Sequence, residues 1–375
     1  MPSLVSLLSA ATWPLGPLLS MSLDAAAASS AAPSGLAPPA SARARGRACA
    51  SLGDHFGMQV AAIPRLLLSA WAYAHLLGDW RGYARELAPA WVAAIVARYV
   101  LLMLLCAVVT DGAHLSPASP WRASMSRHKY SARYPALFER AGGTAPLARD
   151  AAWSCLTAAM AGLLEAAVLH ACAAGRLAFA DTDAWWTHAP TVVLMATWFY
   201  SQNVQFYAMH RCMHRWGVPA GLFDPGAWLY KHVHSLHHQA KNPSAVSGIA
   251  MHPVEAALYL SYALFPCAFA AHPIAVTYIL HNLVAAAMLG HSGFEDPAQG
   301  SHPHFIHHQL VHVNYAENHL PIDWALGTFA ATEEDAHASL QRRLGISDEP
   351  EGAGAPPDKA RKGGARSSKG GKTVD

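Results

Sequence analysis

Apolar runs long enough to cross a lipid bilayer alternate with polar stretches along this chain. A membrane-spanning helix needs roughly 20 apolar residues at a rise of about 1.5 Å each. Four runs have about that length, at residues 59–77, 88–109, 152–173 and 189–208. A fifth block, from Ala256 to Phe294, contains no Asp, Glu, Lys or Arg and is too long for a single pass.

That fifth block carries Pro266 and Pro273 near its middle. Because proline breaks an α-helix, we predict a hairpin of two passes joined around Cys267 to His272. The chain would then cross the membrane six times, with both ends on the same side. The predicted fold class is an all-α, polytopic membrane helical bundle with a cytosolic histidine-rich cap.

Basic residues indicate which side is cytosolic. Six passes put the segments 110–151 and 209–255 on one face, and these segments hold ten Lys and Arg residues, whereas the opposite loops hold three. Cytosolic loops are enriched in Lys and Arg, so the first face is expected to be cytosolic. Arg98 and Glu165 fall inside predicted spans, where charged groups usually face the bundle interior or reach toward an interface.

Composition divides the chain into four parts. Residues 1–54 are rich in Ala, Ser and Pro and poor in acids, which is typical of a disordered or transit-like leader. Membrane helices are expected over 55–180 and a histidine-rich region over 181–345. Residues 346–375 contain too little apolar surface to fold and are predicted to be a disordered tail.

The overall composition is that of a membrane protein, because 53% of residues are apolar and only 13% are charged. The formal net charge of +2 excludes a nucleic-acid partner bound by bulk electrostatics. Six scattered cysteines without a Cys-x-x-Cys pair argue against a disulfide framework or a cysteine zinc site. The unusual feature is the 23 histidines, nearly as many as the 24 acidic residues.

Eight of these histidines form three clusters spaced by three and four residues, as expected for neighbouring side chains on one helical face. Imidazole nitrogens suit iron, zinc and copper, and eight ligands exceed the need of one ion, so two metals are implied. His291, just after the hairpin, is a ninth candidate. The predicted ligands are His210, His214, His234, His237, His238, His291, His304, His307 and His308.

The predicted topology brings all three clusters to the cytosolic face. Neighbouring polar residues could orient the ligands through hydrogen bonds from behind. The candidates for this supporting role are His252, Glu255, His281, His312, Asn314, Glu317 and Asp323. The isolated histidines elsewhere are expected to be ordinary surface or core residues, and no catalytic residue is predicted beyond the metal ligands.

Several of these segments resemble, in order and spacing, the motifs of the fatty acid hydroxylase and sterol desaturase superfamily. The resemblance covers about residues 190–330. One departure is Ala316, where members often have Gly after the Asn-Tyr pair. The matching segments are His210–His214, Lys231–His238, His252–Glu255, Gly290–Gly293, His304–His308, Asn314–Tyr315 and Asp323–Thr328.

The resemblance implies an integral membrane enzyme with a non-haem di-iron centre that uses dioxygen. It also implies reducing equivalents from NAD(P)H through a separate donor, a b-type cytochrome and its reductase. Such a site hydroxylates or desaturates a C–H position of a lipid taken from the bilayer. The arrangement of the last motifs favours a sterol-type lipid, with fatty acyl, sphingoid or carotenoid substrates as alternatives. The expected location is the endoplasmic reticulum, or a plastid membrane if the leader is a transit peptide.

Three other classes are weighed against this hypothesis. A membrane metal transporter would place its ligands within the spans, near the bilayer midplane, whereas the clusters lie at span ends and in loops. A membrane zinc hydrolase is disfavoured because the sequence has no His-Glu-x-x-His motif. A catalytically inactive scaffold of the same fold is disfavoured by the complete set of clustered histidines.

Overall fold

The computed structural model describes residues 80–112, 120, 130, 145–219, 221–294 and 301–344. These residues form helices joined by loops, with no β-strand among them, which confirms the predicted all-α class. The predicted leader, the predicted span at 59–77 and the predicted tail lie outside the described residues.

The first helices of the bundle are α4 (Trp80–Glu86), α5 (Pro89–Ala107) and α8 (Ala145–Ala173). A proline near its first position starts α5, and one π-helical turn, η3 (Val108–Gly112), extends it. Helices α5 and α8 pack closely at Gly162, where a Cβ atom would come within 2.7 Å of the Val96 Cα. By length and composition, α5 with η3 and α8 are the two described helices that could cross a membrane.

The predicted hairpin is present. Its first arm is α11 (Pro253–Leu260), continued by the 3₁₀-helix η9 (Ser261–Phe269), and its second arm is α12 (Ile274–Gly290). The turn between them includes Ala270, whose φ of 47° is in the left-handed region. Each arm is apolar but shorter than a full span. The run at 189–208 forms most of α9 (Ala189–Cys212), and the number of passes stays a prediction.

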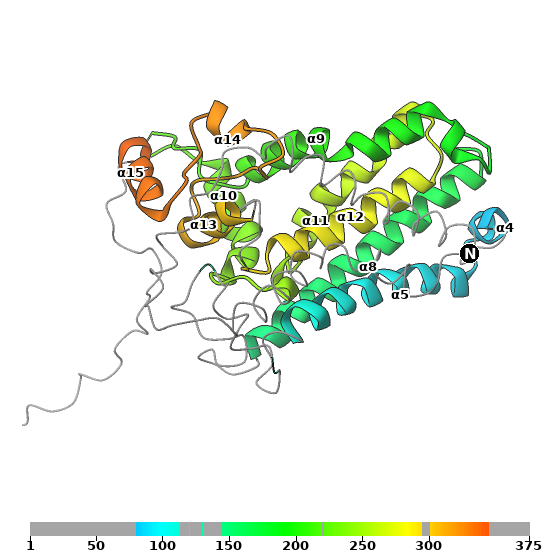
Figure 1. Ribbon diagram of the computed structural model, residues 1–375, viewed down its shortest axis with the longest axis horizontal. Coiled ribbons are helices and arrows are strands. Elements are labelled where there is room, and N and C mark those ends of the chain that lie inside the picture. Colours follow the sequence, from blue (N-terminus) through cyan, green and yellow to red (C-terminus); the bar gives the residue numbers. More distant parts are fainter. Residues whose placement is uncertain are drawn as a thin grey trace, which may run out of the picture.

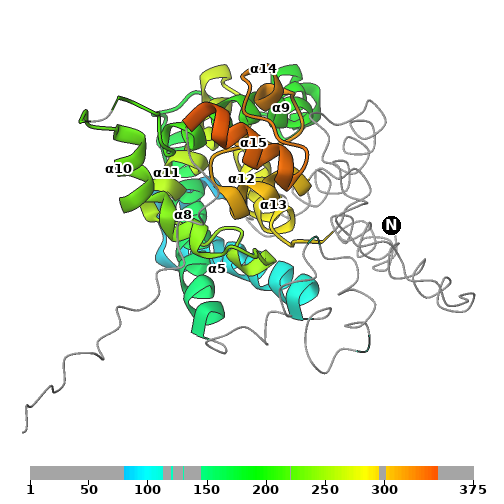
Figure 2. The ribbon, with the colours of Figure 1, turned by 90° about the vertical axis from the view of Figure 1, so that its left-hand side faces the viewer.

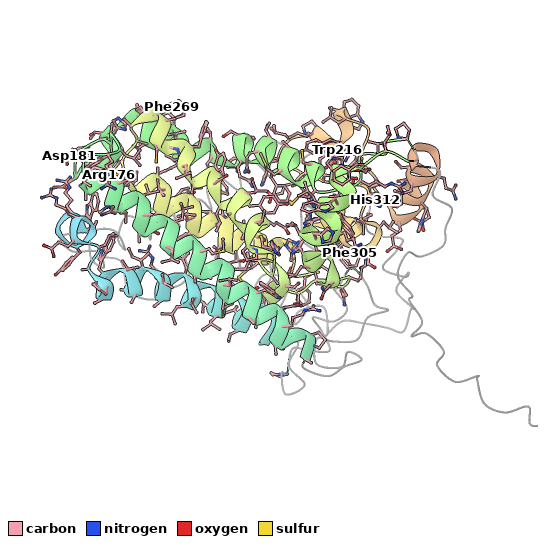
Figure 3. The ribbon with its side chains drawn as sticks, turned by 180° about the vertical axis from the view of Figure 1, so that it is seen from behind. Arg176, Asp181, Trp216, Phe269, Phe305 and His312 are labelled. Atoms are coloured by element: carbon pink, nitrogen blue, oxygen red, sulfur yellow. The ribbon has the colours of Figure 1, made fainter. Side chains whose placement is uncertain are left out.

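The long elements alternate in direction between two ends of the molecule (Figure 1). Figure 3 shows Arg176, Asp181 and Phe269 at one end, beside the hairpin turn, and Trp216, Phe305 and His312 at the other. Because α9 and α12 both finish at the second end, their C-terminal residues meet there. This is the end predicted to be cytosolic.

Short helices cover this second end, as Figure 2 shows by looking along the bundle. A small separate core of Ile306, Val313, Ala330, Ala336 and Leu340 holds α13 against α15. The short helices are α10 (Pro225–His232), η7 (His234–Gln239), η8 (Ala245–Ser247), α13 (His302–Leu310), α14 (Ile322–Ala325) and α15 (Glu333–Leu344), while η6 (Trp185–Thr187) precedes α9 at the opposite end.

The two charged residues within predicted spans pair with each other. A guanidinium nitrogen of Arg98 on α5 lies 2.6 Å from both carboxylate oxygens of Glu165 on α8. Tyr99 and Thr277 also donate hydroxyl hydrogen bonds to this carboxylate. The network joins α5, α8 and α12 in the bundle interior, as expected for charged groups in such segments.

Candidate metal centre

The nine predicted histidines converge at one end of the bundle and sort into two groups. In each group, one nitrogen of every ring lies within 4.8 Å of one nitrogen of each of the others. The first group contains His210, His214, His234, His238 and His307. The second contains His237, His291, His304 and His308.

Four elements supply these rings. The last turn of α9 supplies His210, the second residue beyond α9 is His214, and α13 supplies His304, His307 and His308. His291 is the C-terminal cap of α12. The cluster from His234 to His238 lies on the 3₁₀-helix η7 and not on an α-helix.

The sequence predicts that each three-histidine cluster presents its rings on one helical face. Both clusters divide between the two groups. On η7, His234 and His238 belong to the first group and His237 to the second. On α13, His307 belongs to the first group and His304 and His308 to the second. The two groups are therefore adjacent and interlocked, with the rings of His238 and His308 centred 4.9 Å apart.

Ring nitrogens within each group approach one another closely. In the first group, the Nε2 atom of His234 lies 3.0 Å from Nε2 of His210 and 2.9 Å from Nε2 of His238. In the second group, Nε2 of His291 lies 3.1 Å from Nε2 of His237 and 2.8 Å from Nε2 of His304. Two nitrogens bound at right angles to one ion, at about 2.1 Å each, would be about 3 Å apart.

The opposite edges of most rings are fixed by oxygen acceptors. Nδ1 of His237 lies 3.3 Å from the Ala250 carbonyl oxygen, and Nδ1 of His291 lies against the Ala287 carbonyl oxygen. A carbonyl oxygen only accepts, so each Nδ1 carries the proton and each Nε2 carries a lone pair. His210, His307 and His308 are held in the same way by the carbonyl oxygens of Tyr315, Val313 and Ala240.

His234 has a carboxylate partner in place of a carbonyl. Its Nδ1 lies 2.6 Å from Oε1 of Glu255, which is in the first turn of α11. Both side chains are buried. Burial raises the pKa of Glu255 well above its usual range and lowers the pKa of His234 to about 3.

Burial keeps the rings neutral. It lowers the pKa of His291 to about 4 and the pKa of His237 well below its usual range, with nearby rings adding to the effect on His237. Neutral His237 and His291, each with its proton on Nδ1, therefore present two lone pairs to each other at 3.1 Å. Such a pair cannot form a hydrogen bond, whereas a shared cation would stabilise it.

Buried ring nitrogens without a hydrogen-bond partner also indicate bound cations. Both ring nitrogens of His214 and the Nε2 of His308 are buried and have no hydrogen-bond partner among the described residues. A buried polar atom without a partner costs about 1–3 kcal/mol, so a fold rarely retains several of them together. The donor set therefore fits two ions bound by imidazole, five rings around one and four around the other.

A loop after α13 positions two of the rings. The Asp323 carboxylate accepts hydrogen bonds from the backbone N–H groups of Tyr315 and Ala316, at 2.9 and 2.7 Å. The Asn314 side chain is tied to Pro303 and Ala330, and its backbone φ is 55°. The loop presents the Val313 and Tyr315 carbonyl oxygens to His307 and His210. The turn is thus formed with Ala316, where a glycine was expected from the family resemblance.

The other residues predicted to support the ligands lie at different distances from the groups. Glu255 contacts a predicted ligand directly, and the ring of His312 is centred 6.1 Å from that of His214. Glu317 pairs with His319 and shares backbone hydrogen bonds with Asn203. His252 and His281 contact none of the predicted ligands in these ways and have other roles in the fold.

His252 caps α11 through its own ring, accepting from Val254 N–H. His281 packs against Tyr99 within the bundle, with ring centres 4.9 Å apart, about 15 Å along α12 from His291 at 1.5 Å per residue. His281 therefore lies too far from the histidine groups to support a ligand as predicted. The backbone carbonyls that hold the rings were not predicted, because a carbonyl leaves no signal in a sequence.

Comparison with known proteins gives the same region. Residues 192–328 match the family model described as fatty acid hydroxylase. The very-long-chain aldehyde decarbonylase GL1-11 of Oryza sativa subsp. indica is 29% identical over 157 residues, covering 38% of this chain and 54% of that protein. No solved structure matches the chain.

Two sterol-related proteins are similar to the same degree. Methylsterol monooxygenase 2-2 of Arabidopsis thaliana is 28% identical over 145 residues, covering 35% of this chain and 50% of that protein. Lathosterol oxidase of Rattus norvegicus is 28% identical over 142 residues, covering 35% of this chain and 42% of that protein. The chain thus spans about half the length of the curated relatives it matches.

Proposed function

Because residues 192–328 belong to the fatty acid hydroxylase and sterol desaturase superfamily, we propose that this chain is a membrane-bound oxidoreductase that oxidises a C–H position of a lipid. The observation that carries the proposal is the sorting of nine histidines, eight of them buried and His304 part-buried, into two adjacent groups whose ring nitrogens approach one another. Dioxygen would be the oxidant, and the product would be an alcohol or an alkene.

We infer that the nine histidines hold two iron ions. When bound, such ions supply the redox chemistry with dioxygen that acid, base and nucleophilic side chains lack. The chain's own contribution is geometric. Carbonyl oxygens fix the proton of five rings on Nδ1, so these five rings are preset to bind through Nε2, and Glu255 orients the His234 ring. The burial of the site keeps water from the reacting groups.

A sterol-type lipid is the substrate that we propose first. Its support is the similarity to the methylsterol monooxygenase and lathosterol oxidase, together with the arrangement of the last motifs. The similarity to the aldehyde decarbonylase supports a long-chain acyl-type substrate as the alternative. Sphingoid and carotenoid substrates belong to the same broader alternative. A metal transporter has less support, because the rings gather at one end of α9 and α12 and not midway along them.

The partners and the location are part of the proposal. The electrons would come from NAD(P)H through a b-type cytochrome and its reductase. The catalytic region would be 181–345, on the cytosolic side of the endoplasmic reticulum, with a plastid membrane as the alternative if residues 1–54 act as a transit peptide. The lipid substrate would enter from the bilayer.

Lipid analysis of cells with and without the gene tests this function. We expect one lipid to accumulate without the gene and a product that differs by one oxygen atom or by two hydrogen atoms to disappear. Expression of the intact chain should restore the product, and expression of His237→Ala should not. An unchanged lipid profile, or full restoration by His237→Ala, would contradict the proposal.

A further inference from the structure

Four large apolar side chains project from the loop and helix that follow α9. Trp216, Leu222, Phe223 and Trp228 expose 47%, 66%, 70% and 50% of their surface. We call these four residues the α10 apolar patch. Exposed apolar side chains are common singly, but four within thirteen residues of the chain, two of them tryptophan, indicate an interaction surface.

The segment that carries the patch is held firmly. The Asp224 carboxylate accepts hydrogen bonds from the backbone N–H groups of Trp216, Gly217 and Ala227. The indole N–H of Trp216 donates to the Cys212 carbonyl oxygen at the end of α9. Because these bonds fix the segment, the outward direction of the patch is a built feature of the fold.

Gly226 makes this arrangement possible. A Cβ atom at Gly226 would come within 2.0 Å of the His214 carbonyl oxygen and 2.4 Å of a carbon in the Trp216 indole. Helix α10 can therefore begin directly against the end of α9 only with glycine at this position. The start of α10 and the patch are thus locked to the segment that supplies His210 and His214.

The charges around the patch favour an anionic surface. Arg215 and Lys231 are exposed and lie next to Trp216 and close to Trp228 in the chain. Residues 209–254 contain four Lys or Arg residues and one acid, Asp224, giving 4 − 1 = +3 with histidines neutral. The Asp224 carboxylate is held by backbone N–H groups, and the segment stays net positive with its charge included.

The position of the patch along the bundle matches a bilayer surface. The 24 residues of α9 extend about 36 Å at 1.5 Å each. Trp186, which is 63% exposed, lies just before α9, and Trp216 lies just after it. If α9 crosses the bilayer, as the apolar run at 189–208 predicts, a hydrocarbon core of about 30 Å, or about 40–45 Å with headgroups, would place the two indoles near the two membrane–water interfaces, where tryptophan is enriched.

The neighbouring elements continue the apolar surface. Helices α10 and α11 both pack against α9. Val204 on α9 and Val254 and Leu258 on α11 are exposed to solvent in the isolated chain. These exposed apolar side chains suit contact with lipid tails. The α10 apolar patch lies beyond them, at the end of the bundle that holds the histidine groups.

We propose that the α10 apolar patch is embedded in the headgroup region of the bilayer on the side of the histidine groups, with Arg215 and Lys231 bound to anionic lipid headgroups. This inference rests on the membrane placement within the proposed function. It fixes how deep the site sits, because the patch is locked to the end of α9. The His210 and His214 rings would then lie at the level of the lipid headgroups.

Depth-dependent fluorescence quenching of the full chain in lipid nanodiscs tests this. A fluorescent amino acid is introduced at Phe223, and in a matched control at Glu334, an exposed position on α15 at the same end. Phospholipids brominated near the headgroup should quench the probe at 223 and leave the probe at 334 bright. Aqueous iodide should do the reverse. Quenching at 223 should increase when phosphatidylglycerol is added to phosphatidylcholine, and the Arg215→Gln, Lys231→Gln variant should lose that increase.

Equal iodide quenching at positions 223 and 334 would overturn the proposal. So would a probe at 223 that neither brominated lipid nor iodide reaches, since a protein partner or a second copy would then cover the patch. The readout does not depend on turnover. Lipid contact without lipid oxidation would contradict the proposed function alone, and lipid oxidation without contact at 223 would contradict this inference alone.

Discussion

His234 and Glu255 face each other in the interior of the protein, with Nδ1 of the imidazole 2.6 Å from Oε1 of the carboxylate. Nε2 of His234 lies at nearly equal distances from Nε2 of His210 and Nε2 of His238, at 3.0 and 2.9 Å. Glu255 therefore orients the central ring in the first group.

Replacement of Glu255 should weaken metal binding without removing a ligand. Partners of this kind are typically worth about 10–100-fold in metal affinity or activity, and we expect Glu255→Ala to fall in that range, with Glu255→Gln milder. Metal titration of the stripped protein measures the effect. Glu334→Gln is the control, because Glu334 is exposed on α15 and belongs to neither group. Equal losses in the two variants would argue against a specific role for Glu255.

Replacement of one ring in each group should affect the two ions separately. We expect His307→Ala and His237→Ala each to abolish product formation, because both ions are needed for the proposed chemistry. Each variant should also lose about half of the bound metal, from its own group. Metal analysis and turnover of the membrane-inserted protein provide the measurement. His232→Ala, an exposed ring outside both groups, is the control. Normal turnover in either ligand variant would count against the site.

The metal-free protein should lose stability as the pH falls below about 6.5. Burial lowers the pKa of His234 to about 3 and of His291 to about 4, from 6.5 in the unfolded chain. Between these values the unfolded chain binds more protons than the folded one, so each unit of pH lowers stability by up to about 1.4 kcal/mol per ring. Above 6.5 both states are neutral and the effect is absent.

Thermal unfolding in detergent between pH 7.5 and about 4.5 measures this dependence. The unfolding temperature should fall below about pH 6.5, because the several buried rings outweigh Glu255, whose raised pKa acts in the opposite direction. A variant with His234→Gln and His291→Gln should fall less steeply, because two of the buried titrating groups are gone. An unfolding temperature that rises on acidification would contradict the assignment of neutral buried rings.

The Arg98–Glu165 pair should stabilise the bundle only as a pair. Arg98→Met leaves the buried Glu165 carboxylate without its cation, and breaking a buried pair in this way typically costs about 3–5 kcal/mol. Arg98→Met combined with Glu165→Gln should recover much of that loss, since no unpaired charge remains. Comparison of unfolding in the two variants and the intact chain measures the coupling. Additive losses would show that the two side chains act independently.

Some features of this structure could be predicted from the sequence because their physical cause is local. Spacings of three and four residues identify the His234–His238 and His304–His308 clusters, and two prolines in an apolar block identify the hairpin. The charge of Arg98 and Glu165 within apolar runs predicts that they face the interior. Each of these inferences depends on residues close together in the chain.

Other features depend on contacts between segments that are distant in the chain, and sequence patterns do not predict such contacts. The clusters on η7 and α13 each supply rings to both groups, because the segments that bring in the other ligands lie on both sides of them. The placement of His281 beside Tyr99 follows from the packing of α12 on α5. The Val313 and Tyr315 carbonyls reach the rings only because Asp323 bends the loop that carries them.

The most direct test of the central claim is a count of the metal ions and their positions in the intact, membrane-derived protein. Anomalous diffraction at the iron edge should show two peaks in each molecule. One should lie among His210, His214, His234, His238 and His307, and the other among His237, His291, His304 and His308. A single peak, or peaks away from these rings, would contradict the account.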